Sequence, residues 1–394
     1  MFLFGNYRLD PVLRELRCSD RRIALEPQVF DLLVYLIRHR DRVVSKDDLI
    51  ASVWNGRIVS DSTLDSRINA ARKAIGDSGK RQQAIRTLIR KGFRFVAMVQ
   101  EAGEHPTNAN AQPAVAPKQE ISFCRSSDGV SIAWASVGTG APLVKAANWL
   151  TNVEYDWDSP AWSPLLHWLA ERHRLIRYDG RGTGLSDRPV ADISFAGFVR
   201  DFETVVDAVN VDRFAVLGIS QGASVAIDYV ARHPERVSKL ILLGAYVQGR
   251  NRRGSPAENE KAATFLSMLR QGWGDENSAF MRAFASVFIP SGSSAQIKWF
   301  ADLQRITTNA ENAERVRRAC DEIDVLTVLP RVNVPTLVLH CRQDGVVPLE
   351  QGRIIAAAIP NAQFVTLESD NHILLEGEPA WPRFLQEIES FLHT

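Results

Sequence analysis

The chain of 394 residues has few cysteines and no long apolar segment. Its four cysteines, Cys18, Cys124, Cys320 and Cys341, stand far apart and form no CxxC pair, which argues against a zinc site or a disulfide framework. No run of about 18 apolar residues occurs, so we expect no membrane-spanning helix. The first ten residues, MFLFGNYRLD, lack the basic region and apolar core of a signal peptide. We therefore expect a cytoplasmic protein that needs no metal or organic cofactor.

Net charge is nearly absent too, but the two ends of the chain differ in sign. The whole chain carries +1 at pH 7. Residues 1–101 hold 19 Lys and Arg against 12 Asp and Glu, which leaves 28 against 34 for residues 102–394. The excess is concentrated in residues 57–94, which hold ten basic side chains and three acidic ones. This asymmetry predicts a polyanion partner for the N-terminal part, with an evenly solvated basic face as the alternative.

A composition change divides the chain. Residues 102–119, AGEHPTNANAQPAVAPKQ, are rich in Ala, Pro and Asn and contain Val115 as their single large apolar residue. Such a segment cannot bury a face, which predicts a linker. We expect an N-terminal domain over residues 1–101 and a C-terminal domain over residues 120–394.

Helical spacing of apolar residues predicts three short helices in the N-terminal domain. The first begins at Pro27, where the missing N–H costs nothing. A Ser-x-x-Asp capping box opens the second helix at residues 45–48 and the third at residues 62–65. Strand-like runs lie at residues 7–9, 22–25, 84–88 and 92–98. Three helices followed by a hairpin predict a winged helix-turn-helix.

The third helix has the two faces that a DNA-reading helix needs. Its apolar stripe is Leu64, Ile68, Ala71 and Ile75, and its other side is polar and cationic. Arg and Asn can read base edges in the major groove, while Ser, Thr and Lys can bind phosphates. The alternative is a winged helix used only for protein contacts.

The N-terminal domain closely resembles the winged-helix output domain of OmpR/PhoB-type response regulators. The matching stretches, which cover most of residues 5–98, are LEPQVFDLLVYLI, RVVSKDDLIASVW, TLDSRINAARKAIGD and IRTLIRKGFRFV. The family often has glycine where Arg90 stands, and its receiver domain is missing here, so a signal has to come from beyond the linker. On the helix, the residues expected at the DNA are Ser62, Thr63, Ser66, Arg67, Asn69, Arg72 and Lys73; on the wing they are Arg90, Lys91 and Arg94.

A serine between two glycines dominates the C-terminal domain. The sequence Gly218-Ile219-Ser220-Gln221-Gly222 lies between a short apolar strand and a helix. A G-x-S-x-G turn at a strand-to-helix junction lifts the serine Oγ out of the sheet above a helix N-terminus. Ser220 is therefore a candidate nucleophile.

A serine nucleophile needs a base and an orienting acid. In this architecture both follow in the chain, at the ends of late strands. Asp344 follows the strand TLVLH, and His372 follows the strand FVTL. We expect Asp344 to orient His372, with Asp370 and Asp324 as alternatives.

Residues from about 120 to 394 resemble the α/β-hydrolase superfamily. Besides the three candidate residues, the segments 177–187, 233–237, 335–337 and 347–348 match the family pattern. The resemblance implies an eight-stranded, mostly parallel sheet with a helical cap inserted at about residues 247–325. Because the nucleophile position holds Ser rather than Asp, dehalogenase and epoxide-hydrolase chemistry are not expected.

One oxyanion donor would be the backbone N–H of Gln221. The second usually follows a His-Gly pair, which the strand and loop PLVKAANW lack, so we assign it to the backbone N–H of Trp149. Loss of one such donor costs about 10²–10³ in rate, which would suit a slow enzyme used as a sensor. Most cap aromatics should pack the cap itself, and the remainder should give an apolar pocket.

Together the two parts predict an α/β protein that is a transcriptional regulator. A winged helix would bind promoter DNA, as a homodimer on paired half-sites, and the hydrolase-like domain would sense a small apolar ester or lactone. One alternative is a serine hydrolase with a vestigial or autoregulatory winged helix. Another is a receptor whose triad residues only bind ligand.

Overall fold

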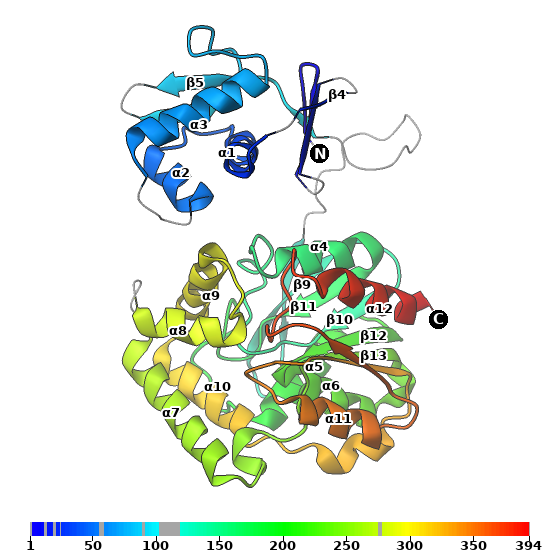
Figure 1. Cartoon of the computed structure of the whole chain (residues 1–394). Coiled ribbons are helices and arrows are strands. Elements are labelled where there is room, and N and C mark those ends of the chain that lie inside the picture. Colours follow the sequence, from blue (N-terminus) through cyan, green and yellow to red (C-terminus); the bar gives the residue numbers. More distant parts are fainter. Residues whose placement is uncertain are drawn as a thin grey trace. The chain divides into compact units, whose positions relative to one another are not determined.

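The computed structural model describes residues 2–11, 14–18, 21–23, 25–54, 59–88, 91–101, 119–274 and 278–393. The chain forms two compact units, residues 1–112 and 113–394 (Figure 1). Residues 102–118 of the predicted linker lie outside the described residues. Gln119 belongs to the second unit, because its side chain donates a hydrogen bond to the Val153 carbonyl at 2.9 Å.

The N-terminal unit contains an antiparallel sheet that the sequence indicated only in part. Its strand order is β4-β3-β2-β1-β7. The strands are β1 (Phe2–Phe4), β2 (Tyr7–Asp10), β3 (Glu15–Cys18), β4 (Arg21–Ile23) and β7 (Gln100–Glu101). The runs predicted at residues 7–9 and 22–25 correspond to β2 and β4. Strands this short carry too little alternation to be recognised from sequence.

The predicted helices and hairpin follow this sheet. They are α1 (Pro27–Arg38), α2 (Lys46–Val53), α3 (Asp61–Ala74), β5 (Ile85–Leu88) and β6 (Gly92–Phe95). Apolar residues from all of these elements form one buried cluster, which includes Leu33, Leu49, Ile68 and Phe95. The capping box predicted for α2 is present, with the Asp48 backbone N–H donating to Ser45 Oγ at 3.0 Å.

The start of α3 differs from the prediction. The helix begins at Asp61, and its N-cap is Ser60 rather than Ser62. Ser60 Oγ accepts the Thr63 backbone N–H at 3.3 Å and also contacts the hydroxyls of Ser62 and Thr63. The sequence offers two serines two residues apart, and the earlier one caps the helix because it satisfies a backbone donor and adds half a turn.

The C-terminal unit is built on the predicted eight-stranded sheet. The strand order is β15-β14-β13-β12-β10-β11-β9-β8. Only the pairs β8–β9 and β9–β11 are antiparallel. The strands are β8 (Glu120–Arg125), β9 (Ser131–Val137), β10 (Pro142–Lys145), β11 (Arg174–Tyr178), β12 (Phe214–Ile219), β13 (Val237–Leu243), β14 (Thr336–Cys341) and β15 (Gln363–Leu367). Apolar residues of the inner parallel strands are buried, as expected for a sheet covered on both faces, whereas Phe364 and Val365 of the edge strand β15 are partly buried.

Helices cover both faces of this sheet. Figure 1 shows α4 (Ser163–Arg172) and α12 (Trp381–His393) on one face, and α5 (Phe195–Ala208), α6 (Gln221–Arg232) and α11 (Leu349–Ala358) on the other. Within the described parts of the chain, no helix has the length and apolar character needed to cross a membrane.

The predicted cap is inserted between β13 and β14. It consists of η2 (Arg250–Arg252), α7 (Pro256–Gly272), α8 (Ala279–Phe288), α9 (Ser294–Thr307) and α10 (Ala310–Asp321). Its aromatic residues mostly pack on one another, as expected: the Phe284 ring centroid lies 4.8 Å from that of Phe265 and 5.2 Å from that of Phe288. Phe280 is an exception and is exposed.

Candidate functional site

The turn that carries Ser220 is a tight elbow between β12 and α6. Ser220 has φ +53° and ψ −125°, a conformation that side chains rarely adopt. A Cβ at Gly218 would lie 2.6 Å from Ala223 Cα, and one at Gly222 would lie 2.7 Å from the Ala147 carbonyl oxygen. Only glycine fits at both positions, so the sequence enforces the elbow.

Asp344 and His372 meet at the ends of neighbouring parallel strands. Asp344 follows β14 and His372 follows β15, which pair in parallel. Asp344 Oδ2 lies 2.6 Å from His372 Nδ1, and both side chains are buried. Asp344 Oδ1 accepts the backbone N–H groups of Val346 and Val347 at 2.8 and 2.9 Å. Burial acts to raise the pKa of Asp344, but His372 and these N–H groups outweigh it and lower the pKa.

The other two aspartates weighed for this role lie elsewhere. Asp370 accepts a hydrogen bond from Ser291 Oγ at 2.7 Å. Asp324 accepts one from the Gln248 side chain at 3.2 Å. Of these three aspartates, Asp344 is therefore the one whose carboxylate contacts the imidazole ring of His372.

His372 Nε2 is the ring nitrogen left for chemistry. It is buried and has no hydrogen-bond partner among the described residues. His372 and Ser220 line one small cavity, together with Trp149, Phe288, Phe300 and Ile373. The arrangement places a serine hydroxyl and an imidazole oriented by a carboxylate around one space.

The two residues assigned to the oxyanion hole flank the same serine. Gln221 is the first residue of α6, and Trp149 lies in the loop after β10; both line a cavity beside Ser220. The loop before Trp149 is held by Lys145 Nζ, which donates to Asn148 Oδ1 at 2.5 Å. Burial lowers the pKa of Lys145 to about 8. The sequence analysis did not identify this contact between Lys145 and Asn148, which holds a loop that lacks the His-Gly pair of the family pattern.

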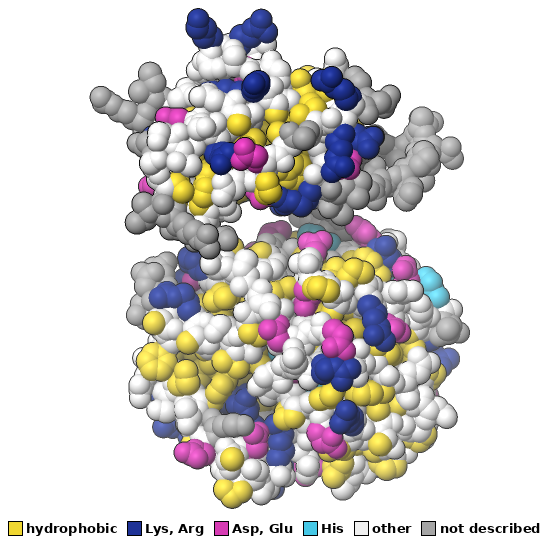
Figure 2. Space-filling model, viewed as in Figure 1, with side chains coloured by type: hydrophobic (Ala, Val, Ile, Leu, Met, Phe, Trp, Pro, Cys, Tyr) yellow, Lys and Arg dark blue, Asp and Glu magenta, His cyan; other side chains and the backbone are white. Residues whose placement is uncertain are grey.

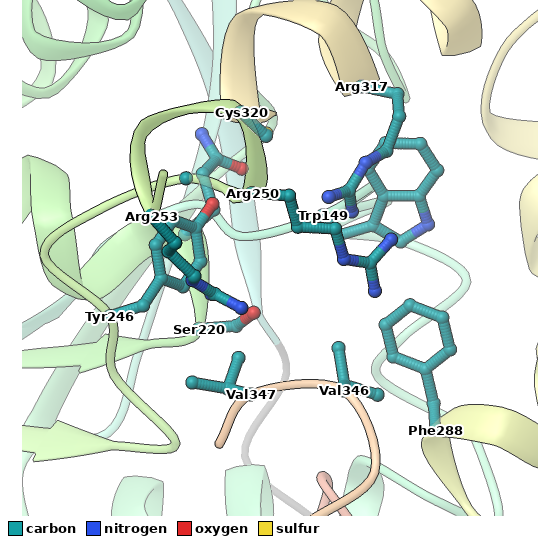
Figure 3. Close-up of a pocket in the computed structure, with 12 residues that line it drawn as sticks. Trp149, Ser220, Tyr246, Arg250, Arg253, Phe288, Arg317, Cys320, Val346 and Val347 are labelled. Atoms are coloured by element: carbon teal, nitrogen blue, oxygen red, sulfur yellow. The ribbon is translucent and has the colours of Figure 1, made fainter. Parts of the chain in front are cut away.

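The cavity beside Ser220 is more cationic than the sequence suggested. Arg250, Arg253 and Arg317 line it with Ser220 (Figure 3). The predicted apolar lining is present in the smaller cavity, at Phe288, Phe300 and Ile373. The signal available in the sequence was the RNRR run at residues 250–253, which lies at the start of the cap and is separated from the end of β13 by six residues.

Four of the predicted DNA-binding residues form one exposed stripe on α3. Ser62, Ser66, Asn69 and Lys73 recur at steps of four, three and four residues, and all are exposed. This spacing places them on one side of a helix, opposite the buried stripe that contains Ile68.

Arg72 corrects the prediction for this helix. It is only 5% exposed, and its guanidinium donates to the Ile85 carbonyl at 2.9 and 3.1 Å and to Thr87 Oγ1 at 2.8 Å. Position 72 borders the buried stripe, so its side chain reaches the first strand of the hairpin instead of solvent. Arg72 therefore joins α3 to β5 and does not face DNA.

Arg67 and Thr63 lie beside the stripe rather than on it. Arg67 forms an ion pair with Glu26 at the start of α1, and Thr63 contacts the cap residue Ser60. On the hairpin, Lys91 and Arg94 are exposed, whereas Arg90 lies outside the described residues. Figure 2 shows more Lys and Arg than Asp and Glu on the visible face of this unit.

Comparison with known proteins agrees with both folds. Residues 155–379, more than half of the chain, match the family described as alpha/beta hydrolase fold. The chain belongs to this family. Residues 20–95 match a second family, described as transcriptional regulatory protein, C terminal. This α/β-hydrolase family member therefore also carries, at residues 20–95, a regulatory domain of a type that binds double-stranded DNA.

The relatives of the hydrolase domain are named for different activities. The chain is 24% identical to the AB hydrolase superfamily protein YisY of Bacillus subtilis, over 64% of this chain and 91% of that protein. It is 27% identical to a non-heme chloroperoxidase of Kitasatospora aureofaciens, over 69% of this chain and 99% of that protein. Among solved structures, an esterase from Exiguobacterium antarcticum superposes with a TM-score of 0.59 at 24% identity, covering 69% of this chain and 99% of the esterase.

Proposed function

We propose that this chain is a DNA-binding regulator whose hydrolase domain binds a small ester or lactone and hydrolyses it through Ser220. The observation that carries the proposal is the state of His372. Asp344 holds Nδ1 at 2.6 Å, while Nε2 is buried and unpartnered among the described residues, in the cavity that Ser220 also lines. An imidazole that is oriented by a carboxylate and keeps a free ring nitrogen is suited to activate a nucleophile, whereas packing requires neither feature.

The reaction follows from these positions. Ser220 Oγ attacks the ester carbonyl carbon as His372 Nε2 takes its proton, and Asp344 stabilises the imidazolium that forms. The carbonyl oxygen becomes an oxyanion that the backbone N–H groups of Gln221 and Trp149 receive. The imidazolium returns the proton to the departing alkoxide. A water molecule then cleaves the acyl-serine by the same steps, releasing the acid and restoring Ser220.

Hydrogen bonds between the cap and the His372 loop support a sensing role. The His372 backbone N–H donates to the Phe288 carbonyl at 2.8 Å, and the Ser291 backbone N–H donates to Asn371 Oδ1 at 3.0 Å. A ligand that fills the cavity would therefore act on the cap and on the triad together. A coupling of about 1–3 kcal/mol would change DNA affinity roughly five- to 150-fold.

The DNA-binding half acts through the exposed stripe of α3 and the wing. Ser62, Ser66, Asn69 and Lys73 offer hydroxyl, amide and ammonium groups to bases and phosphates. Because one short helix binds weakly, the regulator works as a homodimer on paired half-sites. The exposed cations Lys73 on α3 and Lys91 and Arg94 on the hairpin argue against the alternative of a hydrolase with a vestigial winged helix.

Fluorophosphonate labelling of the full chain tests the hydrolase half. Wild type should be labelled, and Ser220→Ala should not. Unlabelled wild-type protein would make the domain a receptor without turnover.

Mobility shifts test the regulatory half. Duplexes enriched by the wild-type protein from a random pool should bind with strong salt dependence. A panel of short-chain esters and lactones should change that affinity. Labelling at Ser220 together with DNA binding that no ester alters would favour the autoregulatory hydrolase.

A further inference from the structure

The three arginines beside Ser220 exceed what hydrolysis of a neutral ester requires. Arg250 lies in η2, Arg253 follows it directly, and Arg317 comes from α10. Figure 3 shows their side chains around one space with Ser220, Trp149 and Phe288. The oxyanion position is already supplied by backbone groups, so these guanidinium groups call for another explanation.

Two of the three arginines have carboxylate partners. Arg317 forms an ion pair with Asp321, with Nε 3.0 Å from Oδ2. Arg253 Nη1 lies 3.2 Å from Glu258 Oε2, and Arg253 Nε donates to the Gln248 carbonyl at 3.0 Å. These pairs account for two positive and two negative charges.

Arg250 has no such partner among the described residues. It is 6% exposed, and its Nη1 is buried without a hydrogen bond. Its guanidinium carbon lies 4.5 Å from the centroid of the Phe265 ring. A ring face attracts a cation but does not satisfy its N–H donors.

The backbone holds Arg250 in this position. A Cβ at Gly249 would lie 2.4 Å from the backbone of Cys320 and Asp321, so only glycine allows η2 to approach the end of α10. The Gly249 backbone N–H donates to the Ile323 carbonyl at 2.8 Å. The first residue after this contact is Arg250, which the approach directs into the cavity.

An unpaired buried cation is costly unless a ligand pairs with it. Burial, together with the charges of Arg317 and Arg253, lowers the pKa of Arg250 to about 10, against the opposing effect of Asp321 and Glu258. Three guanidinium groups and two carboxylates leave one positive charge uncompensated. A single negative charge would complete the cluster, and an arginine fork fits a carboxylate.

We propose that the ligand carries a carboxylate, which Arg250 binds beside the ester or lactone carbonyl that Ser220 attacks. The inference rests on the proposed function for the position of the carbonyl. The apolar groups of the ligand lie toward Phe288, Phe300 and Ile373 in the adjoining cavity. The surplus of one charge matches a carboxylate better than a phosphate dianion.

The size of the space gives this binding a structural consequence. The cavity beside Ser220 has room for only about 20 Å³, little more than one water molecule. A ligand larger than a water molecule therefore requires side chains that line this cavity to change position, and among them Arg250 and Arg317 belong to the cap.

A pair of esters that differ in one charge tests the proposal. The full-length wild type is given 4-carboxyphenyl butanoate and its neutral isostere 4-carbamoylphenyl butanoate. We expect kcat/KM to favour the carboxylate by about 10- to 100-fold, the range of a charge-assisted hydrogen bond. Arg250→Met should reduce this ratio to about one. Equal rates for both esters in wild type, or a preference that survives in Arg250→Met, would overturn the proposal.

Arg252→Met is the matched control. Arg252 belongs to the same η2 turn, but its side chain is 53% exposed and pairs with Glu322 at 3.0 Å. This variant loses the same charge two residues away and should keep the preference. A ratio that falls equally in both variants would attribute the effect to net charge and reject a site at Arg250.

A binding measurement separates this proposal from the proposed function. Calorimetry of wild type should show that the non-hydrolysable 4-(butanoylamino)benzoate binds at least about ten-fold tighter than 4-(butanoylamino)benzamide. Arg250→Met should bind the two alike. If Ser220 is not labelled but this difference holds, hydrolysis fails and the anion site stands. If Ser220 is labelled and the two compounds bind wild type equally, the anion site fails alone. Inorganic phosphate that competes better than the benzoate would reject the carboxylate.

Discussion

Two buried arginines, one in each unit, show opposite ways of using a cation. Arg72, a residue of α3, is 5% exposed, and Arg250, which lines the cavity beside Ser220, is 6% exposed. Arg72 donates to the Ile85 carbonyl and to Thr87 Oγ1, whereas Arg250 Nη1 has no acceptor among the described residues. Equal burial thus accompanies a structural role in the first and an unfilled donor in the second.

Hydrogen bonding of the guanidinium, rather than its burial, therefore distinguishes a structural arginine from a candidate ligand site. A guanidinium that donates to carbonyl and hydroxyl oxygens links two elements of the fold, and its hydrogen-bonding capacity is used within the protein. A buried guanidinium with a donor that has no acceptor destabilises the fold, and a ligand that accepts this hydrogen bond can offset the cost.

The largest effect is expected in a comparison of two aspartates on neighbouring loops, Asp344 and Asp370, which, like the two arginines, differ in their hydrogen-bond partners. Asp344→Asn should lower ester hydrolysis by about 10⁴-fold, because the amide cannot stabilise the imidazolium and favours the wrong tautomer. Steady-state hydrolysis of 4-carboxyphenyl butanoate measures the loss.

Asp370→Asn serves as its control. Asp370 bonds Ser291 rather than the histidine, so this variant should retain activity within a few-fold of wild type. A larger loss in Asp370→Asn than in Asp344→Asn would reverse the assignment of the acid.

The next effect tests the two arginines directly. Arg72→Met leaves the buried Ile85 carbonyl without its side-chain donor and should destabilise the N-terminal unit by about 2–3 kcal/mol. Arg250→Met removes an unpaired buried charge and should leave the hydrolase unit as stable as before, or up to about 1 kcal/mol more stable. Hydrogen exchange of peptides from β5 and from β12 reports on each unit separately. Equal destabilisation in the two variants would contradict the comparison.

The sequence predicted what depends on local pattern. The G-x-S-x-G spacing located Ser220 at the end of β12, because the close approach of Gly218 and Gly222 to backbone atoms permits no other residue. Strand ends located Asp344 and His372, since consecutive parallel strands place their exits at one edge. The order of helices and hairpin likewise predicted the winged helix.

What the sequence could not predict depends on contacts between distant segments. Arg72 lies at the edge of the polar side of α3, and its inward direction is set by β5, which no helical periodicity reveals. Arg250 reaches the cavity because Gly249 packs on the end of α10, some seventy residues along the chain. The N-cap of α3 shows the same limit. It is Ser60 rather than Ser62, although either serine fits the sequence preference for an N-cap residue.

A smaller effect is expected on the exposed stripe of α3, whose single cation is Lys73. Lys73→Ala should weaken DNA binding and reduce the slope of log affinity against log salt by about 1, because one phosphate contact is lost. Arg38→Ala, at the end of α1, removes the same charge from another element and should leave the slope unchanged. An unaltered slope in Lys73→Ala would remove α3 from the interface.

The smallest effect is expected for Arg67, whose guanidinium is only partly paired and is therefore intermediate between Arg72 and Arg250. Its guanidinium pairs with Glu26, but its Nε is buried without a partner among the described residues. Glu26 is largely exposed, and an exposed ion pair contributes at most about 1 kcal/mol. Glu26→Ala should therefore free Arg67 for a phosphate and raise DNA affinity about two- to five-fold, with a steeper salt slope. Filter binding over a salt series measures both quantities. The double variant Glu26→Ala with Arg67→Ala should lose the gain; a gain that persists there would come from the removed negative charge alone, and Arg67 would then be structural, like Arg72.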